Sequence, residues 1–256
     1  KELAARYKVS AYPTFVILDA EGKAVAELKG AMDGPTFIQK LDGKLNPEMT
    51  PERMAERYKV GERTPEFINA YALSLMEMRK EDEGFQVVND YFQSLSKEER
   101  LNPANSFLYT RYTVALNDPK ADFMVAHREE FAEAEKDAVM ERIGRLYHSE
   151  FVTYFSGYKW AEKLFNEEEY QTLKKMLYEL DLVERNNYEP MFRLVEARVK
   201  VDDKAFLKRC KAEYKKLSES GQSLLMMNLT RLIPSKDPEI LKSMSEFIRS
   251  RLATST

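Results

Sequence analysis

The sequence predicts a small α+β part followed by a larger all-α part. Its only strand-like segments lie between residues 14 and 30, where a continuous apolar run precedes a short alternating segment. After residue 46, helix-start signals recur and no convincing strand is found. The 256 residues are 43% apolar and 32% charged, which is typical of a globular, helix-rich chain and not of a disordered one. The length suits one large domain or two ordinary ones.

Charge and hydropathy argue against two classes of partner. The net charge of −3 does not provide the concentrated basic surface that phosphate binding requires, so we expect no nucleic acid as the main partner. No apolar run approaches the roughly 20 residues of a transmembrane helix, so we expect no membrane span in this chain. Cys210 is the single cysteine and cannot form an intrachain disulfide.

The first 46 residues predict the order helix, strand, turn, strand, helix. Residues 1–8 carry apolar side chains at helical spacing, and Ser10 and Pro13 end that helix. The run FVIL at 15–18 predicts a strand buried on both faces. Asp19 to Gly22 supply a turn in which Gly22 takes a positive φ. Residues 24–29 alternate as a second strand, and Gly34-Pro35 opens an amphipathic helix whose apolar stripe is Phe37, Ile38, Leu41 and Leu45.

The segment VSAYPTFVILDAEGK at 9–23, followed by LKG and an amphipathic helix, resembles the closing half of the thioredoxin fold. The resemblance covers residues 1–46, under a fifth of the chain. It implies a cis peptide bond between Tyr12 and Pro13, with Pro13 facing two redox cysteines and the Tyr12 backbone pairing with the substrate. It therefore implies a thiol–disulfide oxidoreductase acting on protein or peptide substrates and exported in a bacterium, for example to the periplasm, with Tyr12 and Pro13 as substrate-binding residues.

The departure from that family is large, because its first strand, first helix, central strand and Cys-x-x-Cys helix have no counterpart here. No catalytic residue, metal ligand or cofactor site can be named, and whether this chain is itself an enzyme stays open. The strand at Phe15–Leu18 is expected to lack a partner on one side, which is an aggregation hazard. We expect the chain to be a fragment of a longer protein; alternatively, the helical region, a neighbouring chain or an oligomer covers this edge.

Residues 47–64 are interpreted as a linker with a connecting helix, and residues 65–256 as helical hairpins. Capping residues followed by Pro or acidic residues occur at Thr50, Thr64, Ser96, Asp118, Asn166 and Asp237. First helices are predicted to begin near Pro65, Asn105, Val139, Asn187 and Gln222, and second helices near Asp82, Ala121, Glu167, Asp203 and Asp237. This spacing belongs to the size class of tetratricopeptide-like hairpins, although no named repeat fits.

Isolated reactive side chains have mostly structural explanations. Cys210 shares an apolar stripe with Phe206 and Tyr214 and is interpreted as a core thiol; the alternative is a reactive thiol beside Arg209 and Lys211. His127 and His148 form no metal-binding pattern and are interpreted as surface or capping residues. The acidic run Glu129, Glu130, Glu133 and Glu135 reads as a solvated face. Two aromatic groups are interpreted mainly as core, and the alternative is that they line a peptide groove. The groups are Phe107, Tyr109 and Tyr112, and Tyr154, Phe155, Tyr158 and Trp160.

Two functions stay open at this point. In the first, the chain is part of a redox enzyme whose helical region recognises substrates or partners. In the second, the helical hairpins form a non-catalytic scaffold that binds a protein or peptide. A helical domain of another role is a third reading, which the sequence does not separate from the second.

Overall fold

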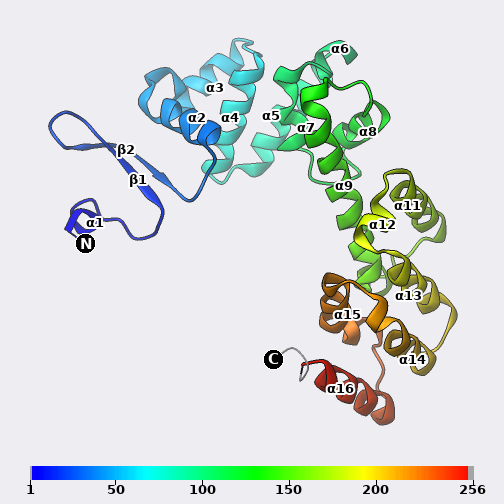
Figure 1. The fold of residues 1–256 in the computed structure, drawn as a ribbon. Helices are drawn as coiled ribbons and strands as arrows, with labels where there is room; N and C mark the ends of the chain where they lie inside the picture. Colours follow the sequence, from blue (N-terminus) through cyan, green and yellow to red (C-terminus); the bar gives the residue numbers. More distant parts are fainter. Residues whose placement is uncertain (1, 253–256) are drawn as a thin grey trace. The chain divides into compact units, whose positions relative to one another are not determined.

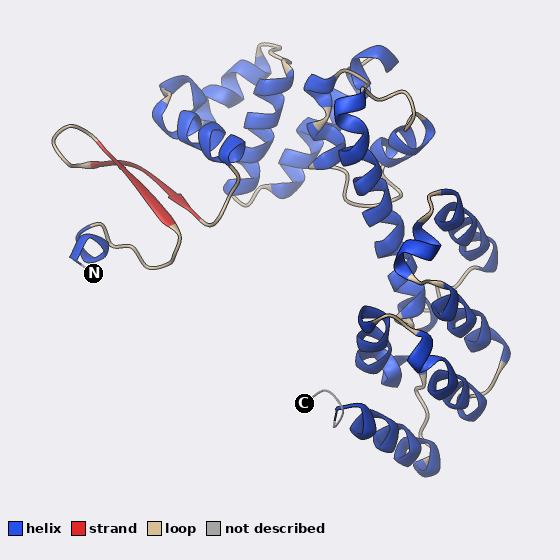
Figure 2. Ribbon diagram, in the orientation of Figure 1, coloured by secondary structure: helices blue, strands red, loops and turns tan. Residues whose placement is uncertain are grey.

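The computed structural model describes residues 2–252, so residue 1 and residues 253–256, the ends of the predicted domains, lie outside the described part. The chain is mostly helical and contains one two-stranded antiparallel sheet near its N-terminus (Figures 1 and 2). From Gly30 onward the described residues contain no strand. The coarse prediction of a small α+β part followed by an all-α part is therefore confirmed.

The chain divides into two compact units. Unit 1 contains the residues up to Thr113 together with Glu129–Lys136, and unit 2 contains Val114–Arg128 and the residues from Asp137 on. The interpreted boundary at residue 65 thus lies inside unit 1, where the helix before it packs on the helix after it.

Unit 1 holds the sheet and the first group of helices. Its elements are α1 (Glu2–Arg6), β1 (Thr14–Leu18), β2 (Ala24–Lys29), α2 (Gly34–Leu45), η1 (Pro47–Met49), α3 (Pro51–Lys59), α4 (Pro65–Glu77), α5 (Glu81–Ser94), α6 (Lys97–Arg100), η2 (Pro103–Asn105) and α7 (Phe107–Thr110).

Among its described residues, unit 2 contains helices and connecting loops but no strand. Its elements are α8 (Pro119–Ala126), α9 (Glu133–Phe155, from Asp137 on), α10 (Tyr158–Ala161), α11 (Glu167–Glu179), α12 (Leu182–Asn186), α13 (Glu189–Lys200), α14 (Asp203–Glu213), η3 (Tyr214–Lys216), α15 (Glu219–Leu232) and α16 (Pro238–Leu252).

The sheet has one covered face. β1 and β2 pair in the register Phe15 opposite Leu28 and Ile17 opposite Ala26. These residues share a face because side chains alternate along a strand, and α2 covers that face: the rings of Phe15 and Phe37 lie 5.0 Å apart. Leu28 is buried, but Phe15 and Leu18 are 42% and 41% exposed. The expectation that β1 is buried on both faces is wrong, because no residue of β1 is fully buried.

The predicted turn and six of the predicted helix caps are confirmed. Gly22 has a φ of +78°, and its turn is closed by the Lys23 N–H, which donates to the Asp19 carboxylate. At six predicted starts the capping side chain accepts a backbone N–H of the first turn, which satisfies a donor that the helix itself leaves free. These residues are Thr50, Thr64, Ser96, Asp118, Asn166 and Asp237.

Two of the predicted hairpins are clear, since α4 packs on α5 and α13 packs on α14. The helix predicted to begin near Asn105 is only α7, which starts at Phe107 and ends at Thr110. The Thr113 hydroxyl donates to the Leu108 carbonyl at 2.9 Å, so a side chain takes the place of a further helical bond there. The helix predicted near Val139 begins earlier, at Glu133.

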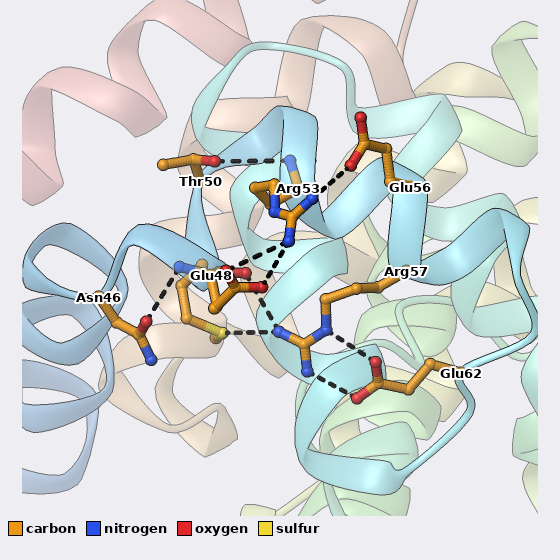
Figure 3. Close-up of polar contacts among 8 residues, drawn as sticks. Asn46, Glu48, Thr50, Arg53, Glu56, Arg57 and Glu62 are labelled. Carbon is orange, nitrogen blue, oxygen red and sulfur yellow. Dashed lines mark hydrogen bonds and ion pairs between the residues drawn. The ribbon is translucent and has the colours of Figure 1, made fainter.

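Arg57 ties α3 to its surroundings in unit 1 (Figure 3). Its guanidinium donates to both carboxylate oxygens of Glu62, at 2.6 and 2.7 Å, and to the Glu48 carbonyl at 3.1 Å. It also lies 4.7 Å from the centroid of the Phe67 ring on α4. These bonds hold the pKa of Glu62 below its usual value, the hydrogen bond from Arg57 being the main cause. Residues 47–64, interpreted as linker and connecting helix, are therefore packed against α4.

Replacing Arg57 with methionine is expected to destabilise unit 1 by about 1–2 kcal/mol, because it removes both a bidentate ion pair and a cation–π contact. The measurement is urea unfolding followed by circular dichroism. Arg53→Met is the matched control, because Arg53 lies one turn before Arg57 on α3 and pairs with Glu48 and Glu56. The Arg53 side chain is 53% exposed, against 29% for Arg57. Equal losses for the two variants would contradict this assignment.

Candidate functional site

The two predicted substrate-binding residues lie between α1 and β1. The Tyr12–Pro13 peptide bond is cis, as predicted. Tyr12 is 80% exposed, so its ring does not belong to the core. Tyr12 therefore lies as an exposed residue directly before the start of β1.

Hydrogen bonds fix the backbone on both sides of Tyr12. The Thr14 hydroxyl donates to the Ala11 carbonyl at 2.7 Å, and the Gly30 N–H donates to the Pro13 carbonyl at 2.9 Å. Within the described part of the chain, the N–H and C=O of Tyr12 themselves form no hydrogen bond. Exposed backbone groups of this kind can pair with an extended peptide.

The bond between Gly30 and Pro13 also shows which backbone N–H and C=O groups of β1 point away from β2. Because Pro13 is bonded to Gly30, alternation along an antiparallel ladder makes Phe15 and Ile17 the residues that bond β2. The N–H and C=O groups of Thr14, Val16 and Leu18 then point away from β2. The predicted incomplete pairing of Phe15–Leu18 is confirmed, since in residues 2–252 β1 pairs with β2 alone. Together with Tyr12, these residues form what we term the β1 edge.

The other edge of the sheet differs in chemistry. β2 carries Glu27 and Lys29, whose side chains form an ion pair at 3.4 Å, whereas β1 carries no charged residue. Charged side chains on an edge strand oppose pairing with a further strand. The β1 edge is therefore the one suited to accept a strand or a peptide.

Cys210 is fully buried in unit 2, and burial raises the pKa of its thiol to about 12. A thiol that stays protonated is a poor nucleophile, so the interpretation of Cys210 as a core residue is confirmed and the reactive-thiol alternative is not supported. No thiol of the described residues serves the Tyr12–Pro13 segment.

The two histidines play local roles. His127 ends α8 at its C-cap, and its ring contacts Phe123. His148 is exposed on α9, and its Nδ1 is hydrogen-bonded to the hydroxyl of the buried Tyr188; partial burial of the ring lowers the pKa of His148. Among residues 2–252 there is no group of three or more side chains that could hold a metal ion.

The acidic run and the aromatic groups are mostly structural. Glu129, Glu130 and Glu133 are exposed, and Glu130 forms an ion pair with Lys97 at 2.8 Å. In the aromatic groups the buried members form core, namely Tyr109, Tyr112, Tyr154 and Phe155, while Tyr158 is exposed. Tyr154 also lines a groove in unit 2. It is the one member of the two predicted aromatic groups that does so.

That groove has a volume of about 750 Å³ and lies between α9, α11 and the loop at 114–117. Its two helix faces are Leu146, Tyr147, Ser149, Glu150, Thr153 and Tyr154 on α9, and Glu168, Glu169, Thr172, Leu173 and Met176 on α11. Sequence reasoning missed it because spacings of three and four residues identify one helix face but not which faces lie together.

Comparison of the chain with models of known protein families, with curated proteins and with solved structures finds no match. None of the helices described here combines the length and the apolar character that a bilayer crossing requires. The β1 edge, the Tyr12–Pro13 segment and the groove of unit 2 are therefore the candidate functional features of the chain.

Proposed function

We propose that this chain is part of a thioredoxin-family thiol–disulfide oxidoreductase of an exported, bacterial type, with its helical part recognising substrates or partners. Tyr12 and Pro13 form the substrate-contacting segment. The proposed reaction requires a redox Cys-x-x-Cys, which residues 1–256 do not contain. The observation that carries the proposal is the β1 edge, which continues without charge or hydrogen-bond partners into the exposed backbone of Tyr12.

The arrangement of the first elements supports this proposal. The order α1, β1, β2, α2 is the order of the closing half of the thioredoxin fold. α2 packs on one face of the hairpin, and no residue of β1 is fully buried, which is consistent with further elements packing on this strand. A hairpin alone is marginally stable, so a strand added at the β1 edge would also complete the sheet.

The proposed reaction transfers two electrons to the substrate. A thiolate of the Cys-x-x-Cys attacks one sulfur of the substrate disulfide, which forms a mixed disulfide and releases the other substrate sulfur as a thiolate. The second cysteine then attacks the mixed disulfide, so the enzyme becomes the disulfide and the substrate leaves as a dithiol. The Tyr12 backbone would hold the substrate strand during both steps, by hydrogen bonds from its N–H and to its C=O.

The test is reduction of insulin by dithiothreitol, catalysed by the product of the complete gene. We expect turnover with the complete product and none with residues 1–256 alone. A complete product that contains no Cys-x-x-Cys, or that does not accelerate insulin reduction, would overturn the redox proposal. Replacing both cysteines of that motif with serine in the complete product provides the control.

The second candidate is a non-catalytic scaffold that binds a protein or peptide through its helices. The groove between α9 and α11 is the observation that favours it. It becomes the leading function if the insulin assay fails while peptide binding is found.

A further inference from the structure

The groove of unit 2 combines an apolar floor with an acidic end. The floor contains the buried side chains of Leu146, Tyr154 and Leu173, and Met176 adds an adaptable thioether. At one border stands Val114, which is exposed on the loop before α8. Val114 therefore adds exposed apolar surface beside the floor.

Its length fits a short peptide segment. The lining residues on α9 run from Leu146 to Tyr154, which is about 12 Å at 1.5 Å per residue. An extended peptide advances by about 3.3 Å per residue, so roughly four residues fit along the groove. The volume of about 750 Å³ lies within the range of sites that enclose most of a bound ligand.

The charges at the acidic end do not cancel. Lys159 is neutralised by Glu150, with Nζ and the carboxylate 2.8 Å apart, and its ammonium also lies over the Tyr154 ring at 5.2 Å. Glu168 and Glu169 form no ion pair in the described part of the chain. The N-terminus of α11 offsets only about half a charge, so a negative charge of more than one remains beside the floor.

We propose that this groove binds a short segment of a protein or peptide that carries a lysine or arginine flanked by apolar side chains. The cation pairs with Glu168 and Glu169, and the apolar neighbours cover Leu173, Met176 and Val114. The hydroxyls of Thr153 and Thr172 already donate to carbonyls of their own helices, so charge and apolar contact provide the selectivity. The inference rests on the proposed role of the helical part in recognition and names the class of partner.

The test is selection of binders from a library of randomised octapeptides displayed on phage, with the full chain as bait, followed by fluorescence anisotropy of the enriched peptides. We expect enrichment of Lys or Arg next to Leu, Ile, Val or Phe. Glu168→Lys should weaken binding about tenfold or more, because it places like charges together. Glu167→Lys is the matched control, since Glu167 lies in the same helical turn but does not line the groove.

A second pair of variants blocks the floor instead of changing the charge near the cation. Thr172→Trp should abolish binding by filling the groove, whereas Lys175→Trp, at an exposed position of α11 outside it, should not. Absence of enriched peptides, enrichment of acidic or uncharged peptides, or binding that survives Thr172→Trp would each overturn the proposal. Insulin reduction and peptide binding are separate measurements, so failure of the peptide proposal and failure of the redox function are distinguishable.

Discussion

Replacing Phe151 with alanine is expected to destabilise unit 2 by about 3–5 kcal/mol, the usual cost of removing a buried aromatic side chain. Phe151 on α9 is fully buried, and its ring lies 4.9 Å from that of Tyr188 and 5.0 Å from that of Phe192 on α13. The variant removes both aromatic contacts and leaves a cavity between the two helices.

Urea unfolding followed by the fluorescence of Trp160 measures this change. Trp160 is the only tryptophan of the chain and lies in unit 2, stacked on Phe165 at 4.0 Å, so its signal reports that unit alone. Met227→Ala is the control at an exposed position of α15. A loss for Phe151→Ala no greater than that of the control would contradict the packing of α9 on α13.

Replacing Glu213 with glutamine is expected to destabilise unit 2 by about 1–3 kcal/mol at neutral pH, because hydrogen bonds to a charged group are lost. Glu213 ends α14 with a side chain only 3% exposed. It accepts from Arg193 on α13 at 3.0 Å and from Lys216 at 3.2 Å. Arg209→Gln is the control, since Arg209 reaches the same carboxylate only at 3.7 Å and should matter less.

The Glu213 variant should also change the dependence of stability on pH. Burial alone would raise the pKa of Glu213, but the hydrogen bonds from Arg193 and Lys216 outweigh burial, and the pKa lies below its ordinary value of 4.5. Glu213 therefore binds its proton at a lower pH in the folded state than in the unfolded state. Its contribution to the free energy of unfolding is present above pH 4.5 and is lost as the pH falls further. The stability gap between wild type and Glu213→Gln should shrink towards about pH 3; a constant gap would show that the carboxylate pairing contributes nothing.

Local signals in the sequence predicted much of the fold. The strand run at 15–18, the positive φ of Gly22 and the caps from Thr50 to Asp237 all depend on contacts within a few residues, and the structure contains each of them. The cis bond before Pro13 was inferred from a resemblance and is also present.

Features that depend on distant residues could not be predicted in this way. Beyond the end of α7, the Tyr112 hydroxyl donates to Asn69, which lies more than 40 residues earlier in the chain. Glu213 looks like one more surface carboxylate until Arg193 is placed beside it. The groove likewise requires knowing that α9 and α11 lie together.

The most direct test of the central claim is amide hydrogen exchange along β1. In residues 1–256 alone, the amides of Thr14, Val16 and Leu18 should exchange fast while those of Phe15 and Ile17 are protected by β2. In a longer gene product that contains this chain, a strand added at the β1 edge should protect all five. Protection of Thr14, Val16 and Leu18 in this chain alone, or fast exchange of these three in the longer product, would contradict the proposal that the β1 edge pairs with a further strand of a thioredoxin-like domain.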